Sequence, residues 1–123
     1  IPSIEHLAAT RDLFDAFDFA DNRITAIENF PRLTRLTSLF FSGNSIENID
    51  SKNMAKNLPN LKSLVLTDNR ISGLHEVAKI GYGAPNLEFL TLTGNPVTSK
   101  FFLSVRTAMY LITINIMKNV QKV

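Results

Sequence analysis

The sequence contains no cysteine, so disulfide bonds, thiolate nucleophiles and zinc sites built on cysteine are excluded. No apolar run approaches the roughly 18 residues that a membrane-spanning helix needs. Glycine-rich phosphate loops and the short motifs of metalloproteases and serine hydrolases are also missing. The two histidines, His6 and His75, are far apart in the chain and suggest no catalytic pair. The sequence therefore predicts no enzyme, no catalytic residue, no metal site, no cofactor, no small-molecule substrate and no membrane association.

The residues present in excess are leucine, isoleucine and asparagine. Leucine and isoleucine together make up 26 of the 123 residues, and asparagine makes up 12. The length fits one domain, and 45% hydrophobic with 20% charged residues is ordinary for a folded protein. The excess therefore suggests a repeated pattern within a single domain.

Four segments share the pattern apolar-x-x-apolar-x-apolar-x-x-Asn-x-apolar. They read FDAFDFADNRI, LTSLFFSGNSI, LKSLVLTDNRI and LEFLTLTGNPV, beginning at Phe14, Leu36, Leu61 and Leu87. Their asparagines lie 22 to 26 residues apart, at Asn22, Asn44, Asn69 and Asn95. A weaker copy begins at Leu111 and includes Asn119. This period and this pattern are those of the leucine-rich repeat.

The pattern predicts an α/β solenoid. Apolar residues two apart, such as Leu64 and Leu66, mark a short strand with one buried face, and the asparagine lies in the following turn, where its amide can bond backbone groups. Stacked copies place parallel strands on the concave face, with loops and short helices on the convex face. The apolar anchors predicted for the convex segments are Ile27, Phe30, Ile49 and Leu74.

The repeats divide the predicted domain, residues 1–123, into three parts. Residues 1–13 resemble the end of a partial repeat, and full repeats begin at residues 14, 36, 61 and 87. Residues 96–123 are predicted to form a C-terminal cap, with a helix from Ser99 to about Met109 before a last apolar strand.

Residues between the strand anchors should face outward on the concave side. Three of them, Phe40, Val65 and Phe89, are apolar and lie on adjacent strands, which favours a binding patch. The charged residues predicted for the same face are Asp15, Asp18, Asp21, Lys62 and Glu88. The three aspartates suit a basic partner better than a metal ion, because a spacing of three on a strand turns successive side chains to opposite faces.

The small net charge of +2 conceals an uneven distribution. Residues 1–21 contain five acidic residues and one basic residue, whereas the residues after Glu88 contain four basic residues and no acidic one. Basic side chains could contact the phosphates of a nucleic acid. The candidates for that role are Arg23, Arg32, Arg35 and Arg70.

The segment IPSIEHLAATRDLFDAFDFADNRI resembles the A-prime family of the spliceosomal U2 small nuclear ribonucleoprotein, and LTLTGNPVTSK resembles the start of that family's cap. The later cap departs from the family pattern, which indicates a divergent member. The resemblance implies a nuclear, non-enzymatic scaffold for pre-mRNA splicing. Its concave face would grip a helix of a B-double-prime-like RNA-recognition-motif protein, and the pair would bind a U2 RNA stem-loop. The alternative is a protein-binding module of the phosphatase-regulating or dynein-associated type, without an RNA role.

Overall fold

The computed structural model describes Ile4, Leu7 and residues 12–100. Within these residues, four short parallel strands form one sheet, in the order β1 (Ala16–Asp18), β3 (Ser38–Phe40), β5 (Ser63–Val65) and β6 (Phe89–Thr91). A second parallel pair consists of β2 (Ala26–Ile27) and β4 (Asn48–Ile49). The helices are α1 (Ser51–Asn57), α2 (Leu74–Gly83) and α3 (Pro96–Lys100). Each predicted repeat contributes one strand of the larger sheet, so the predicted α/β leucine-rich-repeat fold is confirmed.

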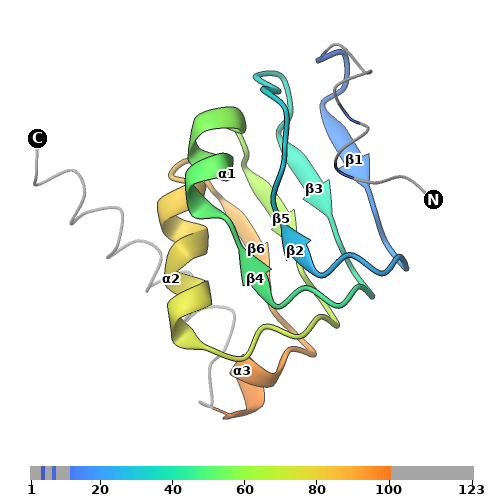
Figure 1. The fold of residues 1–123 in the computed structure, drawn as a ribbon, viewed down its shortest axis with the longest axis vertical. Helices are drawn as coiled ribbons and strands as arrows, with labels where there is room; N and C mark the ends of the chain where they lie inside the picture. The colour runs from blue at the N-terminus through green and yellow to red at the C-terminus, as the bar shows by residue number, and fades with distance from the viewer. Residues whose placement is uncertain (1–3, 5–6, 8–11, 101–123) are drawn as a thin grey trace, which may run out of the picture.

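The core lies between the four-stranded sheet and the layer that contains β2, β4, α1 and α2 (Figure 1). The central residues of the four strands form one register row that points into it: Phe17, Leu39, Leu64 and Leu90. Of these, the three leucines are almost completely buried, and Phe17 is half-buried at the end of the row. Burial of each leucine stabilises the fold by roughly 1.5–3 kcal/mol, so the repeated apolar positions hold the stack together.

The convex segments differ from repeat to repeat. After β1 the chain forms only β2, where Ile27 is fully buried. After β3 it forms β4 and then α1, whose first turn is capped by the Asp50 carboxylate accepting from the Asn53 N–H at 3.0 Å. After β5 it forms α2. No helix in the described part of the chain is long and apolar enough to cross a membrane.

The anchor predicted at Leu74 is wrong. Leu74 is the first residue of α2 and is 40% exposed, whereas Val77 and Ile80 are fully buried. Because this segment is helical, its buried positions follow the 3.6-residue period, and the helix turns Val77 and Ile80 towards the core. The other predicted anchors, Ile27, Phe30 and Ile49, are buried.

The asparagine ladder is present as predicted. The Asn69 Nδ2 donates to the carbonyl oxygens of Phe41 and Leu66 at 2.9 and 3.0 Å, and its Oδ1 accepts from the Ile46 N–H at 3.0 Å. The same kinds of bonds recur at the equivalent buried residues, Asn44 and Asn95. The ladder therefore satisfies turn backbone that the strands leave unpaired. The predicted Asn119 lies outside the described residues.

The residue before each ladder asparagine has a left-handed backbone. These residues alternate between aspartate and glycine, with φ of 58°, 71°, 58° and 79° at Asp21, Gly43, Asp68 and Gly94. A Cβ atom added at either glycine would collide with the aspartate carboxylate of the preceding repeat. Glycine is therefore favoured at these two positions by the left-handed backbone and by the limited space beside the aspartate carboxylate.

The predicted C-terminal cap is described only at its start. The helix α3 begins at Pro96, three residues before the predicted position, because proline suits the first helical turn, where its missing N–H leaves no bond unmade. The Val97 side chain is fully buried, so α3 is attached to the core. The remainder of the predicted helix, the last strand and most of residues 1–13 lie outside the described residues, and the predicted domain limits stay a prediction.

Candidate functional site

The outward face of the four-stranded sheet, here called the sheet face, presents the three predicted apolar residues. The strand register pairs Phe40 with Val65, but it pairs Phe89 with Ser63 and not with Val65. Phe89 is thus diagonal to Val65 on the same face, a separation of about 7–8 Å that an aromatic ring can span. Phe40 and Phe89 are 37% and 52% exposed, and Val65 is half-buried. The three side chains therefore form an oblique apolar strip rather than a straight row.

The predicted acidic residues lie along the β1 edge of the sheet but do not converge. Asp15 precedes β1, Asp18 ends it in register with Phe40, and Asp21 lies in the following left-handed turn. The Asp18 carboxylate accepts from the Ala20 N–H at 2.9 Å. Among the described residues, no group of three acidic or histidine side chains is arranged to hold a metal ion. The edge thus offers separate carboxylates beside the apolar strip, an arrangement suited to a basic partner surface.

Lys62 and Glu88 occupy equivalent places just before β5 and β6. The Glu88 N–H donates to the Lys62 carbonyl oxygen at 2.7 Å, so the two backbones are adjacent. Both side chains are exposed, and within the described part of the chain neither takes part in an ion pair. This end of the sheet face therefore offers one charge of each sign to a partner.

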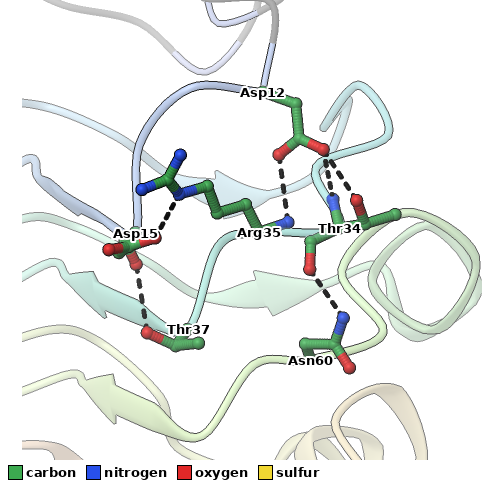
Figure 2. Close-up of polar contacts among 6 residues, drawn as sticks. All are labelled: Asp12, Asp15, Thr34, Arg35, Thr37 and Asn60. Atoms are coloured by element: carbon green, nitrogen blue, oxygen red, sulfur yellow. Dashed lines mark hydrogen bonds and ion pairs between the residues drawn. The ribbon is translucent and has the colours of Figure 1, made fainter.

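A polar network joins the first two repeats at the start of their strands (Figure 2). The Asp12 carboxylate accepts from the Thr34 hydroxyl at 2.7 Å and from the backbone N–H groups of Thr34 and Arg35 at 3.0 and 3.1 Å. These bonds, with the Thr34 hydroxyl as the largest contributor, lower the pKa of Asp12 from its ordinary value of 3.8. Asp12 thereby stabilises the conformation of the loop that leads into β3.

The lowered pKa of Asp12 predicts a defined pH dependence. The carboxylate stabilises the fold when it is ionised, above its unfolded pKa, and this contribution is lost as the pH falls through the lowered folded pKa. Asp12→Asn is therefore expected to be less stable than wild type at neutral pH, with the difference shrinking as the pH falls below the ordinary aspartate value of 3.8. Urea denaturation of both proteins across this range measures the effect. A constant difference at every pH would contradict the assignment.

The network also neutralises one predicted acidic residue. The Arg35 Nε donates to the Asp15 Oδ1 at 2.7 Å, and the two side chains are 58% and 64% exposed. An ion pair this exposed contributes at most about 1 kcal/mol to stability. Its larger effect is on the site, because Asp15 and Arg35 were assigned to different partners from the sequence and instead bind each other. Asp18 and Asp21 are left as the unpaired acidic residues of the β1 edge.

The structure does not bring the four candidate RNA-binding arginines together. Arg23 and Arg70 directly follow the ladder residues Asn22 and Asn69, at the edge where the parallel strands end. Arg32 and Arg35 precede β3, at the opposite edge. The Arg32 Nη1 donates to the Lys56 carbonyl oxygen at 2.6 Å. Arg23 and Arg70 therefore share one exposed edge, whereas Arg32 and Arg35 are engaged within the protein.

The structure contains a second asparagine ladder that was not predicted from the sequence. The Asn60 Nδ2 donates to the Thr34 carbonyl oxygen at 2.6 Å, and the Asn86 Nδ2 donates to the Pro59 carbonyl oxygen at 2.8 Å. Both asparagines stand immediately before the first leucine of a repeat, at Leu61 and Leu87. Their shared position in the repeat alignment is the signal that could have identified them. In the second repeat the same position is Arg35, whose loop is held by Asp12 instead.

The stacked parallel strands, the buried asparagines of the turns and the exposed sheet face are together the features of a leucine-rich-repeat protein. The leucine-rich-repeat family profile matches residues 1–123, and the chain belongs to that family.

Its relatives within the class are the A' proteins of the U2 small nuclear ribonucleoprotein. Over 100 residues the chain is 45% identical to the Arabidopsis thaliana protein, 42% to a probable A' protein of Caenorhabditis elegans and 40% to the Homo sapiens protein. A chain in the crystal structure of the Drosophila melanogaster SNF/U2A' complex matches with a TM-score of 0.75 and 37% identity, covering 80% of this chain and 56% of that one. The chain is therefore a member of the U2 A' family.

The sequence alignments cover 81% of this chain. The chain spans about two fifths of the length of the relatives, with 39%, 39% and 38% of those three proteins aligned.

Proposed function

We propose that the chain is a non-enzymatic scaffold in pre-mRNA splicing, acting in the nucleus. It binds an RNA-recognition-motif protein of the B-double-prime type through the sheet face and helps that partner bind a U2 RNA stem-loop. The observation that carries the proposal is the apolar strip of Phe40, Val65 and Phe89, exposed on the sheet of a chain whose structural relative is in a SNF/U2A' complex.

The shape and charge of the sheet face suit one helix of the partner. An oblique apolar strip can receive the apolar stripe of an amphipathic helix, which presents residues at every third and fourth position. Asp18, Lys62 and Glu88 flank the strip and can pair with the charged sides of such a helix. The strip would supply most of the affinity, and the flanking charges would fix the helix direction.

Introducing a carboxylate into the strip tests the partner site. Phe40→Asp and Phe89→Asp are each expected to weaken binding to a purified B-double-prime-like protein at least about tenfold, because the helix would bury an unpaired charge. Leu74→Asp is the matched control, since Leu74 is an apolar residue of similar exposure at the start of α2, away from the sheet. Isothermal titration calorimetry measures affinity, and circular dichroism checks the fold. Equal affinity of both folded strip variants and wild type would refute the site.

Contact with RNA is assigned to Arg23 and Arg70. These two arginines lie at one edge of the solenoid, and no described side chain forms an ion pair with either. The partner would read the bases, while these arginines add affinity through phosphates of the stem.

A charge-removal series tests this RNA role. Replacing both Arg23 and Arg70 by alanine is expected to weaken RNA binding by the two-protein complex several-fold and to reduce its salt dependence by about two phosphate contacts. The control series is Arg32→Ala and Arg35→Ala, whose side chains are engaged within the protein. Electrophoretic mobility shifts across a range of salt concentrations measure both quantities. An unchanged salt slope for the Arg23 and Arg70 double variant would remove the phosphate role from this edge.

The alternative function, a protein-binding module without an RNA role, predicts the opposite result for a pull-down from a nuclear extract. Under the proposal, the chain captures U2 RNA together with its protein partner, and the RNA disappears from the captured material after ribonuclease treatment while the partner remains. Capture of a phosphatase or a dynein subunit without any spliceosomal RNA would favour the alternative.

A further inference from the structure

A hollow of about 340 Å³ is lined by residues of α1 and α2. These two helices lie on the far side of the core from the four-stranded sheet (Figure 1). The described residues that line it are Ser51, Lys52, His75, Ala78, Lys79 and Tyr82. None of these residues belongs to the sheet face or to the arginine edge. The hollow is therefore a separate feature of the surface, and the function proposed above does not use it.

The helix geometry explains why the hollow forms. His75, Ala78, Lys79 and Tyr82 have the i, i+3, i+4, i+7 spacing that places side chains on one face of a helix, while Val77 and Ile80 occupy the buried face. The helices α1 and α2 are in close contact beside the hollow. A Cβ atom added at Gly83 would lie only 3.2 Å from the Ser51 carbonyl oxygen. The backbones of α1 and α2 therefore approach each other at Gly83, and the longer side chains of α2 project outward next to this contact.

The charged side chains that line the hollow are two lysines, Lys52 and Lys79, and among the described residues no carboxylate lines it. His75 also belongs to the lining. The nearest acidic residue of α2, Glu76, is directed to other groups: its Oε2 accepts from the Ile49 N–H at 3.0 Å, and its Oε1 holds the Lys79 Nζ at 3.2 Å. Glu76 thus fixes Lys79 in place at the rim. The Tyr82 ring, 50% exposed, and the small Ala78 provide apolar surface within the cationic rim.

We propose that this hollow is a docking site for an acidic linear segment of a partner protein. One apolar side chain of the segment would occupy the hollow against Tyr82, and neighbouring carboxylates would pair with Lys52 and Lys79. Residues 101–123 of this chain carry three basic residues and no acidic one, so their charge does not complement the rim. The lining contains no arginine and no asparagine or glutamine, the side chains that most often read nucleic-acid bases. An acidic peptide is therefore favoured over RNA.

A labelled acidic peptide with one central phenylalanine provides the probe, and fluorescence anisotropy with the full chain measures its affinity. Lys52→Glu and Tyr82→Ala are each expected to weaken binding at least about tenfold, as is replacement of the peptide's phenylalanine by alanine. The matched control is Lys56→Glu, which makes the same charge change on α1 outside the hollow, and it is expected to stay within about twofold of wild type. Thermal unfolding confirms that each variant folds.

Three results would overturn the proposal. They are failure of the wild-type chain to bind the probe, an equal loss of affinity in Lys52→Glu and Lys56→Glu, and a single-stranded RNA oligomer that binds in place of the peptide with the same sensitivity to Lys52→Glu. Phe89→Asp, which disrupts the sheet face, is expected to leave peptide binding unchanged. The two proposed sites can therefore fail independently.

Discussion

Replacing Asn69 by alanine is expected to lower the free energy of unfolding by about 3–4 kcal/mol, because the side chain makes three buried hydrogen bonds to backbone. The loss is not shared equally among its partners. The Phe41 and Leu66 carbonyl oxygens each keep a second asparagine donor, from Asn44 and Asn95. The Ile46 N–H accounts for the largest part, because the substitution removes its acceptor and leaves it buried. Urea denaturation followed by circular dichroism measures the change.

Asn22→Ala is the matched control for this prediction. Asn22 has the same place in the first repeat but is only half-buried, and its Nδ2 donates to the carbonyl oxygens of Phe19 and Ala20 at 2.7 and 3.3 Å. Its replacement is expected to cost about 1 kcal/mol. Similar losses at Asn22 and Asn69 would show that the stability of the stack does not depend on the buried part of the ladder.

The substitution Gly94→Ala is expected to destabilise the protein by about 2–3 kcal/mol. Part of this cost comes from a φ of 79°, which alanine adopts unfavourably, and part from contact of the new methyl group with Asp68. The two parts can be separated with Asp68→Gly, which removes the carboxylate while tolerating the left-handed φ of 58°. In that background, Gly94→Ala is expected to cost about 1–2 kcal/mol.

Gly73→Ala provides the control, because Gly73 has an extended backbone with φ of −110° and a Cβ there would meet nothing closer than 3.9 Å. Its effect on unfolding is expected to stay below about 1 kcal/mol. Equal costs for Gly94→Ala with and without Asp68 would show that the carboxylate moves aside freely, and the close contact would then carry no energy.

Features that depend on one repeat alone were predictable from the sequence. Leu64 and Leu66 are buried because a strand alternates its faces, and Asn69 is buried because the turn after that strand needs its amide. These inferences require only the spacing within one copy. The same reasoning identified Phe40 and Phe89 as outward-facing, and both are exposed.

Features that depend on contacts between repeats were not predictable in the same way. Phe89 is an exception, because the alignment of the copies already gives it the position of Ser63, its register partner in the sheet. The Asp15–Arg35 pair joins residues from neighbouring repeats whose flexible side chains have several alternative partners. Leu74 was misplaced because the convex segments do not share one structure, so no repeat pattern specifies their buried positions.

The alternation of aspartate and glycine in the left-handed turns limits how the array can change length. Each aspartate carboxylate occupies the space left by the glycine of the next repeat. Deletion of the single repeat that contains Gly43 would place Asp21 against Asp68, setting two carboxylates side by side where one now faces a glycine. Insertion of one aspartate-bearing copy would do the same. Removal of the repeat that contains Asp68 would instead leave Gly43 beside Gly94 without this conflict, so the described array can lose an aspartate-bearing repeat or gain a glycine-bearing one more readily than the reverse.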